Sequence, residues 1–290
     1  MLKKLYIKKS TYFVFLYGIL FANQALCDFT FTFDPIDVVI PCHKKDLVTL
    51  KRVIRGARKN VKNLGRIIVV SSERLTEDAE WFDERNFPFT KETIAYEIFQ
   101  DETQARAFLD SPKTRIGWIF QQFLKDYSIF VIPGISSNVL IIDADTIFRR
   151  PVRFQDPVTG AGLYNPGTEN HPPYFRHLER VLPGFRKVFP QYSGISHHML
   201  FQRSVMEALF IDITNAHGKE PWKVFCEMID KNELYGSCMC VEYELYFNYI
   251  FARSNLVKIR QLKWINIPFH QFKALKNRGF DYLSCHAYLS

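Results

Sequence analysis

Residues 138–148 read NVLIIDADTIF, an apolar run that ends on two aspartates separated by one residue. A short uncharged run rich in branched side chains predicts a strand buried inside a parallel sheet. Open α/β sheets bind their ligands at the carboxyl ends of such strands, and Asp143 and Asp145 follow at that end. In an extended segment both side chains point the same way, so we expect the two carboxylates to face one site.

Segments on either side of this strand predict an α/β fold. Residues 35–41 (PIDVVIP) and 66–71 (RIIVVS) fit buried strands, and residues 44–59 between them fit a helix with a basic outer face. Strand, helix and strand in this order form a βαβ unit, which indicates a parallel sheet. Another helix is expected over residues 115–127, where apolar residues recur at helical spacing.

The remaining segments are less regular. Residues 73–110 mix turns, a short strand and a helix, and residues 149–190, rich in Pro, Gly, Tyr and His, read as long loops over one edge of the sheet. We expect one helix from residue 197 or 203 to residue 210 and another over residues 240–253. No repeat or linker divides the chain, so residues 28–290 are predicted to form a single domain.

The first 27 residues have the features of a targeting segment. Their only charges are four lysines, and residues 11–22 (TYFVFLYGILFA) are uncharged. A helix of this run is ~18 Å long, short of the roughly 30 Å hydrocarbon core of a bilayer. With Ala25 and Cys27 at the cleavage positions, residues 1–27 resemble a secretory signal peptide, and an uncleaved membrane anchor is the alternative. We expect the protein to be exported or membrane-associated, or to lie at the cytoplasmic face of the membrane if the segment is not cleaved or not used.

The composition excludes several classes of protein. Of 290 residues, 47% are hydrophobic and 23% charged, which suits a globular core rather than a disordered chain. The net charge of +8 falls by half when the four N-terminal lysines are set aside. The remaining body is mildly basic, so no nucleic-acid partner is expected.

The aspartate pair carries the chemical prediction. Two carboxylates at the end of a buried strand repel each other and are costly to desolvate unless a cation or hydrogen bonds offset them. Oxygen ligands suit Mg²⁺ and Mn²⁺, and these ions in turn neutralise a diphosphate. The alternative reading of Asp143 and Asp145 is a helix cap with a surface ion pair.

Six segments together resemble a known family. They read PIDVVIPCHKKD, GRIIVVSSE, RIGWIFQQFLKDY, NVLIIDADTIFRRPV, ISHHMLFQRS and VEYELYFNYI. In this order they resemble the GT-A-fold nucleotide-sugar glycosyltransferases, and in particular a poorly characterised bacterial family of glycosyltransferase-like proteins. The resemblance covers nearly all of the chain from Pro35 to His286. It implies a single Rossmann-like GT-A domain, with a central and mostly parallel sheet flanked by helices.

The resemblance also implies a donor and a cofactor. The donor would be a nucleotide-diphosphate sugar, a UDP- or GDP-sugar, held through Mn²⁺ or Mg²⁺ by Asp143 and Asp145. A histidine near the C-terminus often completes the metal shell in such folds, and His286 matches by position. A histidine ligand favours Mn²⁺ over Mg²⁺. The nucleotide base and ribose would be flanked by the end of the first strand, with Pro41, His43 and Lys44.

On the acceptor side, an inverting transferase needs a carboxylate that removes the proton of the acceptor hydroxyl. The resemblance places an acidic segment at Glu242 and Glu244. Residues two apart on a helix lie roughly 200° around its axis, so only one of them can face the cleft. We prefer Glu242, and the alternative is that both are helix-start carboxylates favoured by the helix dipole. A retaining mechanism would not need this base.

Four further residues are candidates for substrate contacts. His197 and His198 precede an apolar stretch that borders the same cleft and would contact the donor or acceptor sugar, unless one is a hydrogen-bonded core histidine. Gln122 and Lys125 face away from the apolar stripe of their helix and would reach the donor diphosphate, unless that face is simply solvated.

The sequence thus predicts a metal-dependent glycosyltransferase that moves a sugar from a nucleotide-diphosphate donor to a hydroxyl of a carbohydrate or glycolipid, in surface glycan or glycoconjugate synthesis. One alternative is an exported, non-catalytic carbohydrate-binding protein on a transferase fold, because nucleotide sugars are scarce outside the cytoplasm. Another is a haloacid-dehalogenase-like phosphatase, which also uses a strand ending in D-x-D. The phosphatase requires a threonine where Ile147 stands.

Overall fold

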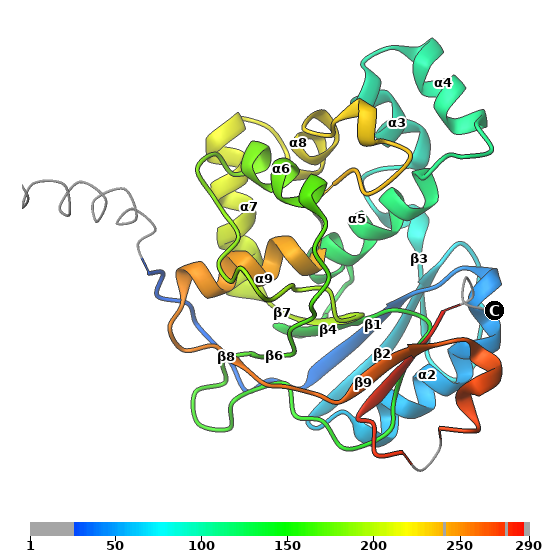
Figure 1. Ribbon diagram of the computed structural model, residues 1–290, viewed down its shortest axis with the longest axis vertical. Helices are drawn as coiled ribbons and strands as arrows, with labels where there is room; N and C mark the ends of the chain where they lie inside the picture. Colours follow the sequence, from blue (N-terminus) through cyan, green and yellow to red (C-terminus); the bar gives the residue numbers. More distant parts are fainter. Residues whose placement is uncertain (1–25, 240–241, 276–277, 287–290) are drawn as a thin grey trace, which may run out of the picture.

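The computed structural model describes residues 26–239, 242–275 and 278–286. Its centre is a five-stranded sheet in the order β3-β2-β1-β4-β7, in which only β7 runs antiparallel to its neighbour. The predicted α/β fold with a mostly parallel sheet between helices is therefore confirmed (Figure 1). The strands of this sheet are β1 (Ile36–Pro41), β2 (Leu64–Ser71), β3 (Glu80–Asp83), β4 (Asn138–Ile142) and β7 (His198–Gln202).

Helices cover both faces of the sheet. The helix α2 lies on one side, and α5 lies on the other together with the helices of the C-terminal half (Figure 1). The helices are α2 (Leu47–Asn60), α3 (Lys91–Phe99), α4 (Glu102–Asp110), α5 (Ile116–Val131), α6 (Pro172–Val181), α7 (Arg203–His217), α8 (Pro221–Glu227) and α9 (Glu242–Arg253), with the short 3₁₀ turns η1 (Lys44–Asp46), η2 (Glu84–Asn86), η3 (Lys231–Glu233) and η4 (Phe269–Phe272).

Two smaller sheets extend the molecule beyond the central one. The first has the order β5-β10-β9, formed by β5 (Thr146–Phe148), β10 (Tyr282–Cys285) and β9 (Trp264–Ile267). The second pairs β6 (Leu163–Tyr164) with β8 (Lys258–Ile259). Because β5 directly follows the aspartates and pairs with β10, the last described residues of the chain return to the end of β4.

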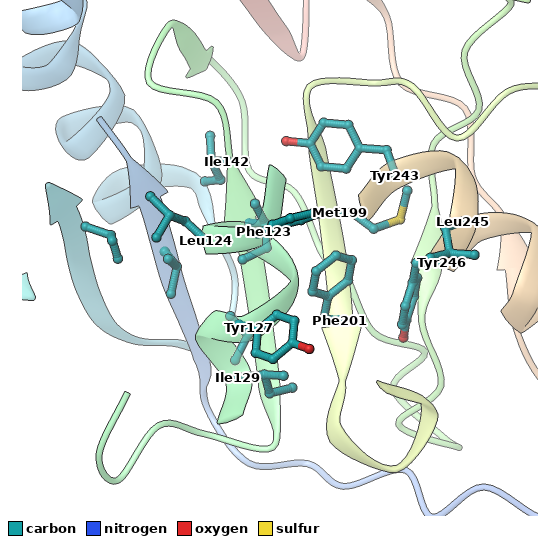
Figure 2. Packing of buried hydrophobic residues seen from close by; sticks show 14 of the residues in the cluster. Phe123, Leu124, Tyr127, Ile129, Ile142, Met199, Phe201, Tyr243, Leu245 and Tyr246 are labelled. Carbon is teal, nitrogen blue, oxygen red and sulfur yellow. The ribbon is translucent and has the colours of Figure 1, made fainter. Parts of the chain in front are cut away.

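Part of the hydrophobic core lies between the sheet and the helices α5 and α9. Figure 2 shows aromatic side chains of α5 and α9 packed over Met199 and Phe201 of β7. Phe123, Phe201, Tyr246 and Ile142 are at most 1% exposed. This packing fixes α5 and α9 against the strand ends, which positions their polar side chains as described below.

Several predicted elements differ from the structure. Residues 149–190 contain the helix α6, which begins at two prolines and buries His177, Leu178 and Val181 on one side; so short a stripe is hard to see among loop residues. The helix expected from residue 197 or 203 begins at Arg203 and continues to His217, where Gly218 ends it with a positive φ. Residues 1–25 of the predicted signal segment and residues 240 and 241 of the last predicted helix lie outside the described residues. Within the described part of the chain, no helix has the length and hydrophobicity required to span a bilayer.

Candidate functional site

The order of the strands creates a switch point at the aspartates. The chain passes from β1 to β2 and β3 on one side, and then crosses to β4 on the other side of β1. All of these strands are parallel, so the ends of β1 at Pro41 and of β4 at Ile142 lie at the same edge. Helices leave neighbouring strands in opposite directions at such a point, and the crevice between them is where open α/β sheets bind ligands.

The two aspartates lie in a turn and not in an extended segment, which corrects the prediction of a shared side-chain direction. The Thr146 N–H donates to the carbonyl of Asp143 and closes the turn between β4 and β5, over 3.0 Å. The backbone N–H of Asp143 donates to His197 O, and Cys285 N–H donates to Asp145 O. Asp143 is consequently fixed to the residue before β7 and Asp145 to β10, and each carboxylate has its own set of partners.

Asp143 is neutralised by a buried lysine. Its Oδ1 accepts hydrogen bonds from Lys125 Nζ at 2.6 Å and from the Tyr243 hydroxyl at 2.9 Å, and its Oδ2 lies 3.3 Å from His197 Nδ1. Burial opposes ionisation, but the Lys125 ammonium and the His197 hydrogen bond outweigh it and hold the pKa of Asp143 well below its ordinary value. Asp143 is therefore ionised throughout the physiological pH range.

Lys125 also binds Glu242, the first residue of α9. Its Nζ lies 2.9 Å from Glu242 Oε1 and 4.5 Å from the centre of the Tyr243 ring. Burial lowers the pKa of Lys125, but its two carboxylate partners reverse the effect and raise it. Burial also raises the pKa of Glu242 to about 7, against the attraction of Lys125 and with a contribution from the charge of Asp143. The ammonium of Lys125 thus binds two buried carboxylates, and the pKa of the second, Glu242, is about 7.

Asp145 pairs with the histidine at the end of β10. Asp145 Oδ2 lies 2.9 Å from His286 Nδ1, and its Oδ1 accepts from the Ser284 hydroxyl at 3.2 Å. Burial lowers the pKa of His286, but the hydrogen bond and charge of Asp145 raise it above its ordinary value. The rings of His197 and His286 are 4.7 Å apart, centre to centre, so the two aspartate–histidine pairs meet.

A third carboxylate faces the same edge, which sequence reasoning missed. Asp46 precedes α2 but makes no side-chain capping bond. Burial raises the pKa of the Asp46 carboxyl, and against the attraction of Lys45 the charges of Asp145 and Asp143 raise it further. Nearby, the Thr49 hydroxyl donates to Ala144 O at 2.8 Å and ties α2 to the aspartate turn. An aspartate before a helix normally caps that helix, so the sequence predicts a capping role for Asp46. In the structure the capping bond is absent, and the carboxyl is affected by Asp143 and Asp145 instead.

Tyr243 was also missed. It adjoins Glu242 in the sequence and is buried in the core between α9 and β7, where it appears at the upper end of the cluster in Figure 2. An aromatic residue at helical spacing normally indicates core packing, and no sequence signal shows that its hydroxyl reaches Asp143.

The structure places the other predicted residues in different surroundings. Pro41 is buried in β1, whereas His43 and Lys44 are exposed and Lys44 pairs with Glu73 at 2.6 Å. Gln122 and Lys125 are each 2% exposed, so the alternative of a solvated helix face is wrong for both, and their contact with the donor diphosphate stays a prediction.

His198 and Glu244 point away from the aspartates. The His198 ring is enclosed by Phe148, Phe154 and Tyr282, at 4.9–5.5 Å between ring centres, so it is a core histidine and not a sugar contact. Glu244 Oε2 accepts from Gly194 N–H and from Asn248 Nδ2. Of the two predicted pairs, only His197 and Glu242 belong to the network around Asp143.

The side chains fit a divalent cation by their chemistry. Carboxylates of Asp143 and Asp145 with the imidazole of His286 form a mixed oxygen and nitrogen donor set of the type that Mn²⁺ accepts. The buried Nε2 of His197 has no hydrogen-bond partner among the described residues, which leaves one more nitrogen at this point. Within the described ranges, no three His, Cys, Asp or Glu side chains are grouped to hold an ion. In the structure Asp143 contacts Lys125 and His197, and Asp145 contacts His286.

Comparisons with known proteins give a structural neighbour. No family model matches the chain, and no curated protein sequence matches it. Among solved structures, the chain is similar to mouse xyloside xylosyltransferase 1 in its apo form, with a TM-score of 0.39 and 13% sequence identity. The match covers 89% of this chain and 99% of that chain.

Proposed function

We propose that the protein is a metal-dependent glycosyltransferase that uses a nucleotide-diphosphate sugar as donor and a hydroxyl of a carbohydrate or glycolipid as acceptor. The observation that carries this proposal is the position of the carboxylates. Asp143 and Asp145 lie at the switch point of a mostly parallel sheet, together with Asp46 and the ion pair of Lys125 and Glu242. Carboxylate oxygens at this edge are ligands that a divalent cation prefers, and a bound divalent cation neutralises the charge of a diphosphate.

In this proposal, Asp143, Asp145 and His286 hold Mn²⁺ or Mg²⁺. The bound ion would neutralise the charge that develops on the diphosphate as it leaves the sugar. Lys125 keeps Asp143 ionised and fixes its orientation from the other side, because its Nζ is 2.6 Å from Asp143 Oδ1. The end of β1, with the exposed His43 and Lys44, is the proposed surface for the nucleotide.

Glu242 is the proposed general base of an inverting transfer. Of the two glutamates at the start of α9 it is the one that faces Asp143, and a pKa of about 7 suits a base that works near neutral pH. As the acceptor oxygen bonds to the anomeric carbon and the bond to the diphosphate breaks, the hydroxyl proton passes to Glu242. Residues 1–27 would export the protein or attach it to a membrane, where it would serve surface glycan or glycoconjugate synthesis.

Calorimetric titration with UDP tests the donor site. We expect binding in the presence of Mn²⁺ that EDTA abolishes, and at least tenfold weaker binding by Asp145→Ala. The matched control is Asp78→Ala, because Asp78 is an exposed aspartate far along the chain from the switch point. Metal-independent binding of UDP, or equal loss in both variants, would contradict the proposal.

A comparison of UDP binding with turnover tests the role of Glu242 as the base. Glu242→Gln should keep metal-dependent UDP binding within about twofold and lower the turnover of a sugar nucleotide by roughly 100-fold or more. Glu244→Gln is the control, since this side chain faces Gly194 and Asn248. Turnover that survives in Glu242→Gln would indicate a retaining route or another base.

A further inference from the structure

A second candidate binding site lies between α2 and η4. A pocket of about 240 Å³ is lined there by Arg52, Phe269, His270, Phe272 and Lys273. Three of these side chains carry or can carry positive charge, and the other two present aromatic rings. None of the five is acidic.

The position of Arg52 shows how the pocket is built. Its guanidinium carbon lies 4.9 Å from the centre of the Phe269 ring and 5.6 Å from that of Phe272, and the two rings stack at 6.3 Å. The only hydrogen bond recorded for its side chain among the described residues goes to Val48 O, at 3.3 Å. Stacking on aromatic faces holds the guanidinium without using most of its N–H donors. Those donors remain for a ligand.

In another pocket of the same protein, acidic side chains offset the positive charges. It is lined by Arg58 and Arg74 but also by Glu77, Asp78 and Glu80, and Arg74 pairs with Glu77 at 2.7 Å. In the pocket beside η4, by contrast, no ion pair to Arg52 or Lys273 is formed by the residues that the structure describes. Like charges that converge without a counter-charge repel each other, so an anion would stabilise this arrangement.

The pocket adjoins the candidate transferase site without being part of it. Arg52 lies three residues after Thr49, which ties α2 to the aspartate turn. Burial and the charge of Asp145 raise the pKa of Cys285, the residue before His286, and the nearby charges of Arg52 and Arg149 oppose this shift only in part. A ligand in this pocket would therefore lie beside the edge that holds Asp145 and His286.

We propose that this pocket binds a phosphate ester, with Arg52 and Lys273 binding the phosphate and the rings of Phe269 and Phe272 packing against the group that carries it. An arginine fork binds phosphate oxygens in pairs, and a planar ring face accepts a sugar or glycerol moiety. A volume of about 240 Å³ exceeds what a bare phosphate ion needs. The phosphate can belong to a soluble sugar phosphate or to a lipid headgroup, and both have this chemistry.

Titrations in EDTA test the site without the metal-dependent donor. The probes are glucose 6-phosphate, glucose, and vesicles of phosphatidylglycerol or phosphatidylcholine. We expect glucose 6-phosphate to bind and glucose not to bind. Arg52→Gln and Lys273→Gln should each weaken binding at least fivefold, whereas Lys59→Gln, an exposed charge two turns along the same helix, should change it less than twofold. Lys273→Gln leaves the contacts of Arg52 with both rings in place, so its loss of binding cannot come from a disturbed η4.

The vesicles distinguish the two sources of phosphate. Sedimentation with phosphatidylglycerol that glucose 6-phosphate competes away, and that Arg52→Gln removes, identifies a lipid headgroup; binding of the sugar phosphate alone identifies a soluble ligand. Equal binding of glucose and glucose 6-phosphate, or a loss in Lys59→Gln as large as in Arg52→Gln, would overturn the proposal. This site does not depend on the transferase proposal, because Arg52→Gln should keep Mn²⁺-dependent UDP binding and Asp145→Ala should keep phosphate binding. A failed UDP titration would therefore contradict only the transferase proposal, and a failed glucose 6-phosphate titration would contradict only the phosphate site.

Discussion

Lys125 shows how much one residue can depend on its partners. Its side chain is 3% exposed and bridges Asp143 and Glu242, which come from a turn and from a helix far apart on the chain. A buried ion pair is costly to form, but removing one partner is costlier still, because the remaining charges stay desolvated. Removal of any one charged residue from the network around Asp143 is therefore expected to destabilise the folded protein.

Replacement of Lys125 tests this dependence. Lys125→Met should lower the free energy of unfolding by about 3–5 kcal/mol at pH 7, because it leaves two buried carboxylates without a cation. Urea denaturation followed by circular dichroism measures the loss. The double variant Lys125→Met/Glu242→Gln should recover part of it, since one of the two charges is gone. A single variant that unfolds at the same urea concentration as the native chain would show that solvent reaches these carboxylates.

His198 predicts a specific response to acid. Burial lowers its pKa to about 3, and the charge of Arg260 adds to this effect. Neither ring nitrogen has a hydrogen-bond partner among the described residues, so the folded protein keeps this ring neutral. Because the unfolded chain binds a proton near the ordinary pKa of about 6.5, this histidine lowers stability as the pH falls from about 6.5 towards 3.

His198→Leu should remove that contribution. Between pH 7 and pH 4.5, the variant should lose about 2–3 kcal/mol less stability than the native protein. Urea unfolding at the two pH values measures the difference, and His43→Leu, at an exposed position, is the control. Parallel losses in the native protein and His198→Leu would mean that the buried ring accepts a proton.

At the scale of elements, the packing of α2 on β5 positions the aspartate turn. The helix approaches β5 closely because Gly56 has no side chain. A Cβ at Gly56 would lie 2.9 Å from the carbonyl oxygen of Phe148 and 3.1 Å from its nitrogen. Both atoms belong to the backbone and cannot rotate away. The same helix carries Thr49 and Arg52, so its position affects the transferase site and the proposed phosphate pocket together.

Two glycine-to-alanine substitutions test this packing in opposite directions. Gly56→Ala should destabilise the protein by about 1–3 kcal/mol, because the helix must move away from β5. Gly117→Ala, where a Cβ meets nothing within 4 Å, should stabilise it by about 0.5–1 kcal/mol through the better helix propensity of alanine. Thermal unfolding of both variants checks the signs. Equal shifts would show that the α2–β5 contact is looser than the structure indicates.

At the scale of the whole molecule, the candidate site joins segments from both ends of the chain. The end of β1, the turn after β4, the start of β7, the start of α9 and the end of β10 contribute to it. Such a site exists only in the folded chain. A ligand that binds there must therefore stabilise the entire fold against unfolding.

Thermal unfolding with ligand tests this expectation. UDP with Mn²⁺, at about 100 times the dissociation constant, should stabilise the native protein by about 2.7 kcal/mol. UDP in EDTA should not raise the melting temperature, and UDP with Mn²⁺ should stabilise Asp145→Ala by about 1.4 kcal/mol or less, because its binding is at least tenfold weaker. A rise in the presence of EDTA would place the nucleotide elsewhere on the surface.

The sequence by itself determined the frame of this protein and the position of its acidic edge. Short apolar runs rich in branched side chains located β1, β2 and β4, and apolar residues at helical spacing located α2 and α5. The apolar run before Asp143 also placed the aspartates at a strand end.

Only the tertiary structure decided which side chains meet there. Lys125 looks like part of a solvated helix face until α9 covers it. The adjacent His197 and His198 differ because His197 lies before β7 with a positive φ and reaches Asp143, whereas His198 begins the strand and points into the core. Tyr243 and Asp46 join the network through contacts between distant segments. Local patterns report how a segment packs, whereas partners depend on how the whole chain folds back on itself.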